Sequence, residues 1–230
     1  MFKSSSLPLK WVYSFIIIFL FVTHPELHAQ DPLRLEQEVL SLKQQKEIDW
    51  NPYRPTILFT GSSSIRMWKN MREVFPEFQV INTGFGGSHA SDLYYFLEDL
   101  VLDYHPIKTF IYEGDNDLAS GKSVRKTLKD LGAVVAGIRF RYPGMPIVCI
   151  AAKPSISRWK LRAKYQRFNH KLALWAKKQQ DLEFADVWQP MLLEGGQLNE
   201  SLFIEDGLHM NSEGYRIWQT ALAPYVSLKF

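Results

Sequence analysis

The stretch at residues 56–68, TILFTGSSSIRMW, decides the fold. Its apolar run at 57–59 ends in Gly61 and three serines, after which a helical pattern resumes. An apolar run closed by glycine and small hydroxyl residues is typical of a strand that enters a tight strand-to-helix turn. Such a turn lifts a hydroxyl above the sheet edge and points backbone N–H groups at the same place. A serine-rich helix cap has the same composition, so the rest of the chain must decide between the two.

Apolar runs and helical segments alternate along the rest of the chain. Strands are expected at 57–59, 78–82, 109–112, 147–151 and 182–187. Helices are expected at 32–48, 91–104, 124–142, 161–180 and 212–222. The strands lack strict polar alternation, and a helix follows most of them. This pattern indicates an α/β protein whose parallel sheet is buried on both faces.

The first 29 residues have the pattern of a secretory signal peptide. Lys3 and Lys10 lead into an apolar segment at 11–22, and the small residue Ala29 marks the predicted cleavage site. That segment is short for a membrane-spanning helix, which needs about 20 apolar residues. We therefore expect a secreted or periplasmic protein with no membrane span after cleavage; an uncleaved anchor is the alternative. An N-terminal helix and linker at 30–55 then precede the domain at 56–230.

Composition excludes several classes of function. With 27 basic and 24 acidic residues and no run of like charge, the chain has no feature that favours a nucleic-acid partner. The single cysteine, Cys149, cannot form an intramolecular disulfide, and its apolar neighbours indicate a core residue in a buried strand. The sequence does not indicate an oligomeric state.

Chemically distinctive residues follow each predicted strand, at the edge of a parallel sheet where a site is expected. His209 follows Asp206 by three residues across a glycine-containing turn, so the carboxylate can fix the imidazole tautomer. A serine of the first turn could then act as nucleophile, with His209 as its base. An Asp206 that caps the following helix would also explain this spacing. Of the other histidines, His89 could line the site but is better explained by its turn.

Three donors could converge on the negative charge of a tetrahedral intermediate. They are the N–H of Ser63, a glycine N–H from the segment 82–88, and the side-chain amide of Asn116. Glycine allows a close approach of the backbone, and asparagine donates without a charge that would retain a product carboxylate. Ordinary turn chemistry would also account for these glycine- and asparagine-rich segments.

On these segments the sequence resembles the SGNH hydrolases, also called GDSL esterases and lipases, from about residue 57 to 215. The family's Gly-Asp-Ser-Leu block matches 61–64, its second-block glycine matches Gly87, Gly-x-Asn-Asp is 114–117, and Asp-x-x-His is 206–209. The resemblance implies a flavodoxin-like three-layer α/β/α sandwich with five parallel strands in the order 2-1-3-4-5. It implies no metal or organic cofactor. The roles that it implies are a catalytic Ser63, Asp206 and His209, with oxyanion donors at Ser63, Gly87 and Asn116.

The first block departs from the family pattern. Ser62 replaces the usual aspartate and Ser64 replaces the usual leucine or isoleucine. Because three hydroxyls are adjacent, Ser62 and Ser64 remain alternative nucleophiles, and Gly86 remains an alternative to Gly87 as a donor.

The substrate is less well indicated than the chemistry. The resemblance implies an ester of a small molecule or carbohydrate, and no long apolar insertion predicts a lid, so a short acyl group is favoured. Lys153, Arg158 and Trp159 are candidate contacts for a polar or sugar leaving group, although a plain loop before a cationic helix is the simpler interpretation. Export together with a short acyl group favours deacetylation of an extracellular carbohydrate. An acyltransferase, a lysophospholipase and a catalytically silent glycan-binding domain are the alternatives.

Overall fold

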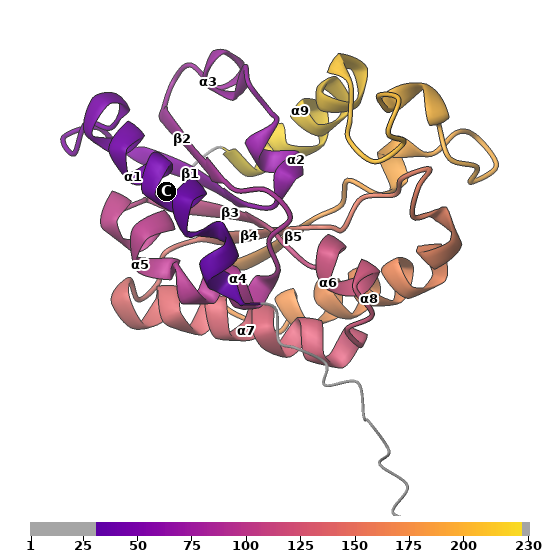
Figure 1. The fold of residues 1–230 in the computed structure, drawn as a ribbon, viewed down its shortest axis with the longest axis horizontal. Helices are drawn as coiled ribbons and strands as arrows, with labels where there is room; N and C mark the ends of the chain where they lie inside the picture. The colour runs from indigo at the N-terminus through magenta and orange to yellow at the C-terminus, as the bar shows by residue number, and fades with distance from the viewer. Residues whose placement is uncertain (1–30, 227–230) are drawn as a thin grey trace, which may run out of the picture. The chain divides into compact units, whose positions relative to one another are not determined.

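A five-stranded parallel sheet runs through the computed structural model, which describes residues 31–226 (Figure 1). The predicted signal peptide at 1–29 lies outside the described residues. The sheet order is β2-β1-β3-β4-β5, and all four neighbouring pairs are parallel, which confirms the predicted order. The strands are β1 (Thr56–Gly61), β2 (Gln79–Gly84), β3 (Lys108–Tyr112), β4 (Ile147–Ile150) and β5 (Leu182–Ala185).

Helices cover both faces of this sheet, and the three-layer sandwich is confirmed (Figure 1). One face packs against α1 (Glu36–Asp49), α4 (Ala90–Tyr95), α5 (Leu97–Leu100), α7 (Val124–Arg141) and α8 (Arg162–Ala176). The other packs against α2 (Ser63–Arg66), α3 (Met71–Val74) and α9 (Ser212–Val226). The short helix α6 (Asp115–Ala119) follows β3. Single 3-10 turns occupy Pro32–Leu35, Leu102–Tyr104, Trp159–Leu161, Gln189–Met191 and Glu200–Leu202.

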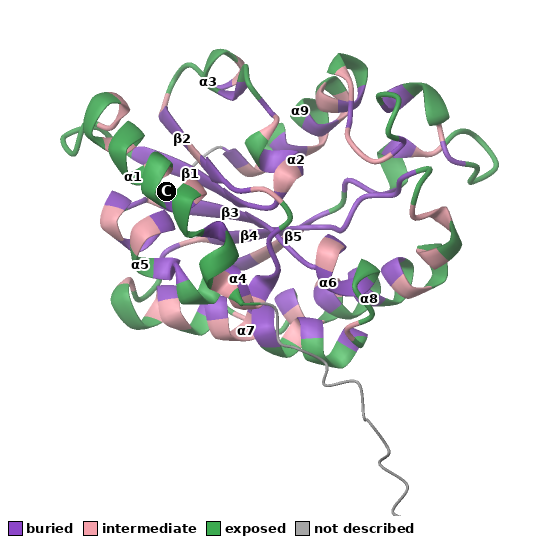
Figure 2. Cartoon of the chain, viewed as in Figure 1, coloured by how far each residue is buried: buried purple, intermediate pink, exposed green. Residues whose placement is uncertain are grey.

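Burial on both faces explains why the strands are apolar throughout. Along β1, Leu58 lies in the core on the α7 side, whereas Ile57 and Phe59 lie in the core on the α9 side. All three side chains are fully buried. The strands of the sheet are coloured mostly as buried in Figure 2. Cys149 is likewise buried in β4, where burial raises the pKa of its thiol to about 12. No helix in the described part of the chain is long and apolar enough to cross a membrane.

The helix predicted at 91–104 is broken into α4, α5 and a 3-10 turn. Tertiary hydrogen bonds hold carbonyls at the end of α5 and in the 3-10 turn, whereas neither of them involves Phe96, between α4 and α5. The hydroxyl of Thr83 donates to the carbonyl of Leu100 (2.8 Å), and the hydroxyl of Tyr142 donates to the carbonyl of Leu102 (2.6 Å). A carbonyl occupied by a distant side chain no longer needs a helical partner, and local periodicity carries no sign of this.

Gly61 makes the turn at the end of β1 possible. Its φ is +119°, and a Cβ at this position would lie 2.1 Å from the carbonyl oxygen of Tyr112. That carbonyl accepts a hydrogen bond from the next amide, Ser62 N–H (3.0 Å). The close approach therefore fixes where the chain leaves the sheet and where the serines begin.

We predict that Gly61→Ala lowers the free energy of unfolding by at least about 2 kcal/mol, because alanine adds a clash with backbone and a strained φ. Gly132→Ala is the matched control. Gly132 lies inside α7 with nothing within 4 Å of an added Cβ, so alanine should raise stability by about 0.5–1 kcal/mol. Urea unfolding measures both changes; equal stabilities for Gly61→Ala and wild type would contradict the turn geometry.

Candidate active site

Ser63, His209 and Asp206 come together at the carboxyl edge of the sheet. The Oγ of Ser63 lies 2.9 Å from Nε2 of His209, and Nδ1 of the same ring lies 2.6 Å from Oδ2 of Asp206. Ser63 is the first residue of α2, directly beyond β1, whereas the other two residues lie in a turn before α9. Such a line of three groups lets a serine hydroxyl pass its proton to imidazole while a carboxylate holds the ring.

The turn at 206–209 holds Asp206 as a carboxylate. One oxygen of Asp206 accepts the backbone N–H groups of Leu208 and His209 (2.8 Å each), and the other faces the His209 ring. Desolvation opposes ionisation, but these hydrogen bonds outweigh it and lower the pKa of Asp206 to about 2. The carboxylate is therefore available to orient His209 at every pH at which the protein is expected to work.

The three adjacent serines have different surroundings. Ser62 is buried, and its Oγ accepts a hydrogen bond from Nδ2 of Asn116 (2.6 Å). Ser64 is buried as well, and its carbonyl accepts the hydroxyl of Tyr215 (3.0 Å). Only Ser63 contacts the imidazole of His209. This arrangement favours Ser63 over its two neighbours as the nucleophile.

The glycine pair after β2 is also distinguished by its contacts. The N–H of Gly86 is shared by both carboxylate oxygens of Glu38, at 3.0 and 2.9 Å. Gly87 has a φ of +70°, and its N–H has no acceptor among residues 31–226. The N–H of Ser63, at the first position of α2, likewise has no acceptor in that range. Gly87 is thus the better candidate donor.

Asn116 lies between these groups. Its Nδ2 donates to Ser62 Oγ and to the carbonyl of Ser88 (2.9 Å), which ties the loop after β3 to the loops after β1 and β2. The residue begins the short helix α6 together with Asp115, beyond a glycine with φ of +108°. The amide of Asn116 is therefore held against Ser62, the residue before Ser63, and against the loop that carries Gly87, which makes it a candidate donor of an oxyanion hole.

Glu38 and Arg34 were missed by reasoning from the sequence. Both belong to the N-terminal segment, which packs through Leu35 and Val39 against the core of the domain. Arg34 contacts the carboxylate of Asp92 (2.5 Å) and the carbonyl of Gly87 (3.4 Å). Glu38 accepts the N–H of the neighbouring residue, Gly86. No local motif marks these residues, because an amphipathic helix does not reveal which loop its polar side chains reach.

The three residues predicted to contact a leaving group have structural contacts. Lys153 is 1% exposed, and its Nζ donates to the carbonyl of Leu208 (2.6 Å). Burial lowers the pKa of this ammonium to about 8, against an opposing effect of Asp115. Arg158 contacts Asp115 and Asn116, and Trp159 stacks on Trp188 with ring centroids 6.1 Å apart. The side chain of Lys153 is therefore a support of the catalytic turn and does not face solvent.

A buried carboxyl supports the loop that carries Gly87. Oε1 of Glu113 accepts the hydroxyl of Ser88 (2.7 Å), and its Oε2 has no partner within the described residues. Burial raises the pKa of Glu113 well above its usual value, and the nearby charge of Asp117 adds to this. A neutral carboxyl group at this position avoids the cost of an unpaired buried charge.

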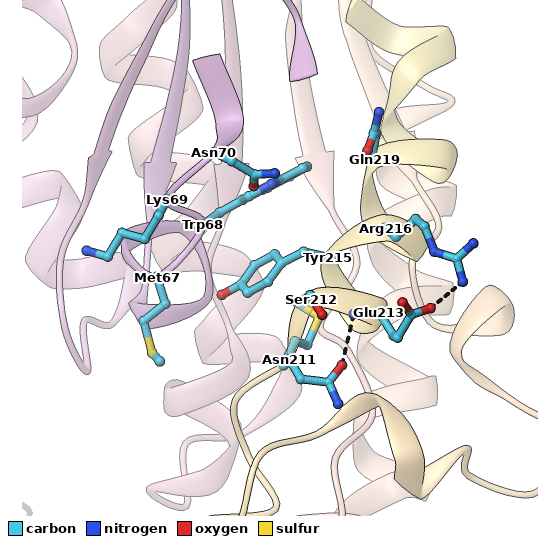
Figure 3. A pocket seen from close by; sticks show the side chains of 11 residues that line it. Met67, Trp68, Lys69, Asn70, Asn211, Ser212, Glu213, Tyr215, Arg216 and Gln219 are labelled. Atoms are coloured by element: carbon cyan, nitrogen blue, oxygen red, sulfur yellow. Dashed lines mark hydrogen bonds and ion pairs between the residues drawn. The ribbon is translucent and has the colours of Figure 1, made fainter. Parts of the chain in front are cut away.

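A pocket of about 500 Å³ lies between the segment that follows α2 and the start of α9 (Figure 3), and none of the three catalytic candidates lines it. Two of its lining residues adjoin the candidates directly: Met67 donates its N–H to the Ser63 carbonyl (2.9 Å), and Met210 follows His209. The ring of Tyr215 lies in the centre of the view. Polar side chains share the lining: Lys69, Asn70, Asn211, Ser212, Glu213, Arg216 and Gln219.

Comparisons with known proteins point to one family. Residues 59–217 match the model of the GDSL-like lipase/acylhydrolase family, whereas no curated protein matches the chain. A Streptococcus pneumonia protein named for platelet activating factor has a similar fold, with a TM-score of 0.75, 23% identity, and coverage of 85% of this chain and 94% of its own. A carbohydrate esterase of family 3 from Talaromyces cellulolyticus has a similar fold as well, with a TM-score of 0.63, 16% identity, and coverage of 75% of this chain and 96% of its own. An acetyl esterase mutant whose structure was solved with acetate ion is also similar, with a TM-score of 0.61, 14% identity, and coverage of 75% of this chain and 96% of its own.

We predict that Glu113→Gln flattens the pH dependence of stability. The folded chain keeps a proton on Glu113 that the unfolded chain releases above about pH 4.5. The free energy of unfolding of the wild type should therefore fall as pH rises from the pKa of Glu113 in the unfolded chain, about 4.5, towards its higher pKa in the folded chain. Glu113 should contribute up to about 1.4 kcal/mol per pH unit to this fall. Glutamine has no proton to lose. Urea unfolding at pH 5, 6.5 and 8 measures the difference, with the exposed Glu98→Gln as control; an unchanged slope in Glu113→Gln would show that Glu113 is ionised when folded.

Proposed function

Because the chain belongs to the GDSL-like lipase/acylhydrolase family, we propose that it is a serine esterase that hydrolyses short-chain esters, above all acetyl esters of carbohydrates. One observation carries the proposal. Ser63 Oγ, the two ring nitrogens of His209 and a carboxylate oxygen of Asp206 form a continuous line of contacts of 2.9 and 2.6 Å. A serine in this arrangement is a nucleophile for acyl transfer.

The first half of the reaction forms an acyl-enzyme. Ser63 Oγ attacks the ester carbonyl carbon while Nε2 of His209 takes the hydroxyl proton, and Asp206 stabilises the imidazolium through Nδ1–H. The oxyanion of the tetrahedral intermediate accepts hydrogen bonds from the N–H groups of Ser63 and Gly87, and it replaces Ser62 Oγ as the acceptor of one N–H of Asn116 Nδ2. Collapse of the intermediate breaks the ester C–O bond, and His209 gives its proton to the departing alcohol.

The second half releases the acid. Water enters where the alcohol left, gives a proton to Nε2 of His209, and attacks the acyl carbon of Ser63. The same donors stabilise the second oxyanion. When the C–Oγ bond breaks, the proton returns from His209 to Ser63, so that the free enzyme and a carboxylic acid result.

The choice of a short acyl group rests on what surrounds Ser63. The segments that follow β1, β2 and β3 are short turns, whereas the segment after β5, at 186–211, is longer and carries Asp206 and His209. None of the three short turns has a long apolar insertion that would form a lid or an acyl tunnel. The names of two similar structures, an acetyl esterase and a carbohydrate esterase, agree with this choice. We assign the alcohol part of the substrate to the pocket between α2 and α9, because its aromatic ring and amide side chains suit a sugar.

The site of action follows from the N-terminal sequence. Residues 1–29 have the charged start, apolar segment and small cleavage-site residue of a signal peptide. We propose cleavage after Ala29 and a secreted or periplasmic enzyme that acts on esters outside the cytoplasm. Mass spectrometry of the mature chain from its native host tests this part, and an intact N-terminus would contradict it.

We predict that the chain hydrolyses p-nitrophenyl acetate faster than the butyrate and the butyrate faster than the octanoate. Ser63→Ala should abolish the activity, while Ser62→Ala and Ser64→Ala, which lack the His209 contact, should retain most of it. Spectrophotometric assay of released p-nitrophenol measures all four proteins. Activity that survives in Ser63→Ala would move the nucleophile to a neighbouring serine, and an inactive folded wild type on every ester would overturn the proposed function.

We predict that Asn116→Ala lowers kcat by about 100- to 1,000-fold, the usual loss for one oxyanion donor, with little change in KM. The reason is that Nδ2 contacts the substrate oxygen most strongly once that oxygen is charged. Steady-state kinetics on the acetate ester gives both constants, and circular dichroism checks that the variant is folded. Full activity in a folded Asn116→Ala would exclude Asn116 from the oxyanion hole.

A further inference from the structure

Arg158 forms a bridge behind the oxyanion hole. Its Nη2 donates to Oδ1 of Asn116 (2.9 Å), and its Nη1 donates to Oδ1 of Asp115 (2.5 Å). The residue lies in the segment after β4, and its side chain is 18% exposed. The two acceptors are consecutive in sequence, and the planar guanidinium contacts both at once.

The contacts on either end of the Asn116 amide fix its orientation. The Ser88 carbonyl can only accept a hydrogen bond, so the atom of Asn116 that faces it must be Nδ2. The guanidinium of Arg158 can only donate, so the atom that faces it must be Oδ1. An amide turned by 180° would lose both bonds. The arrangement therefore keeps the N–H groups of Asn116 directed at Ser62 Oγ, in the residue before Ser63, and at the Ser88 carbonyl.

Asp115 fixes the guanidinium in turn. Its carboxylate is buried and accepts hydrogen bonds from the hydroxyls of Tyr112 (2.9 Å) and Tyr165 (2.7 Å) as well as from Arg158. A carboxylate with these partners has no freedom to follow a moving side chain. Arg158 is thus anchored at one end, and its other end is directed at Asn116.

The segment that carries Arg158 also contacts the catalytic turn. The N–H of Ser157 donates to the carbonyl of Gly207 (3.0 Å), and Lys153 Nζ reaches the carbonyl of Leu208 (2.6 Å). Residues 153–158 therefore contact both halves of the site, the turn with His209 and the amide of Asn116. A single rigid segment can in this way keep the distance between base and oxyanion donor constant.

We propose that Arg158 is a positioning residue, which holds the Asn116 amide in its donating orientation and strengthens its N–H donors through a charge-assisted bond to Oδ1. The inference rests on the proposed esterase function. Hydrogen bonds in a chain polarise one another, so an amide whose oxygen accepts from a guanidinium donates more strongly from its nitrogen. Arg158 acts through Asn116 and does not contact the substrate.

Three variants and one double variant test this assignment by steady-state kinetics on p-nitrophenyl acetate. Arg158→Leu should lower kcat by about 10- to 100-fold with KM within about twofold, since part of one donor's effect is lost. Arg158→Lys keeps a charge for Asp115 but lacks the fork, and should lose at least about threefold. Arg162→Leu is the control and should match wild type, because the only hydrogen bond and ring contact of the Arg162 side chain within residues 31–226 are with Trp159.

The double variant separates positioning from substrate contact. If Arg158 acts through Asn116, adding Arg158→Leu to Asn116→Ala should lower kcat by less than about threefold further. Losses that multiply in full, or a raised KM with unchanged kcat, would overturn the assignment and make Arg158 a substrate contact.

A second readout does not need esterase activity. The side-chain NH₂ signals of Asn116 in ¹H–¹⁵N spectra, identified by their loss in Asn116→Ala, should shift in Arg158→Lys and stay in place in Arg162→Leu. Unmoved Asn116 signals in Arg158→Lys would refute the role of Arg158, whether or not the wild type is active. An inactive wild type would refute the proposed esterase function and would leave this test of Arg158 unaffected.

Discussion

Parallel pairing of β1 with β2 and β3 determines where the serine turn, the glycine loop and Asn116 of the candidate site lie. In this arrangement all three strands end at the same edge, so the residues that follow them meet although they are far apart in sequence. Gly61 is the point at which the constraint is tightest, because only a residue without Cβ passes the Tyr112 carbonyl there. The turn that results presents Ser63 to His209, whose own position depends on the segment beyond β5.

The sequence was sufficient for the fold because the relevant signals are local. Apolar runs without polar alternation, separated by helical segments, indicate a parallel sheet buried on both faces. The strand order needed the resemblance to a known family, since alternation alone does not order strands. Helix ends were harder to predict. Helix α5 ends at Leu100, whose carbonyl accepts the hydroxyl of Thr83 in β2. A hydrogen bond from a distant side chain to a helix carbonyl does not change the local pattern of apolar residues, so the sequence does not reveal it.

The candidate site also contains residues that the sequence could predict and residues that it could not. Ser63, Asp206, His209 and Asn116 lie in short motifs whose spacing reflects their chemistry, and the structure brings all four together. Their supports could not be predicted. Glu38 reaches Gly86 across 48 positions of sequence, and Arg158 reaches Asn116 across 42. A charged residue in a helix or loop has many possible partners, and only the packed fold decides among them.

Charge is distributed around the site so that the donors themselves stay neutral. The proposed oxyanion hole consists of backbone and amide N–H groups, while two carboxylates behind these donors face arginines: Glu38 with Arg66, and Asp115 with Arg158. A bare cation among the donors would stabilise the oxyanion but would also bind the product carboxylate. When the cation lies one bond behind the amide and its charge is balanced by a buried carboxylate, it can polarise the donor with little attraction for a departing anion. In the proposed mechanism, the ion pairs behind the loops thus favour transition-state stabilisation together with release of the acid.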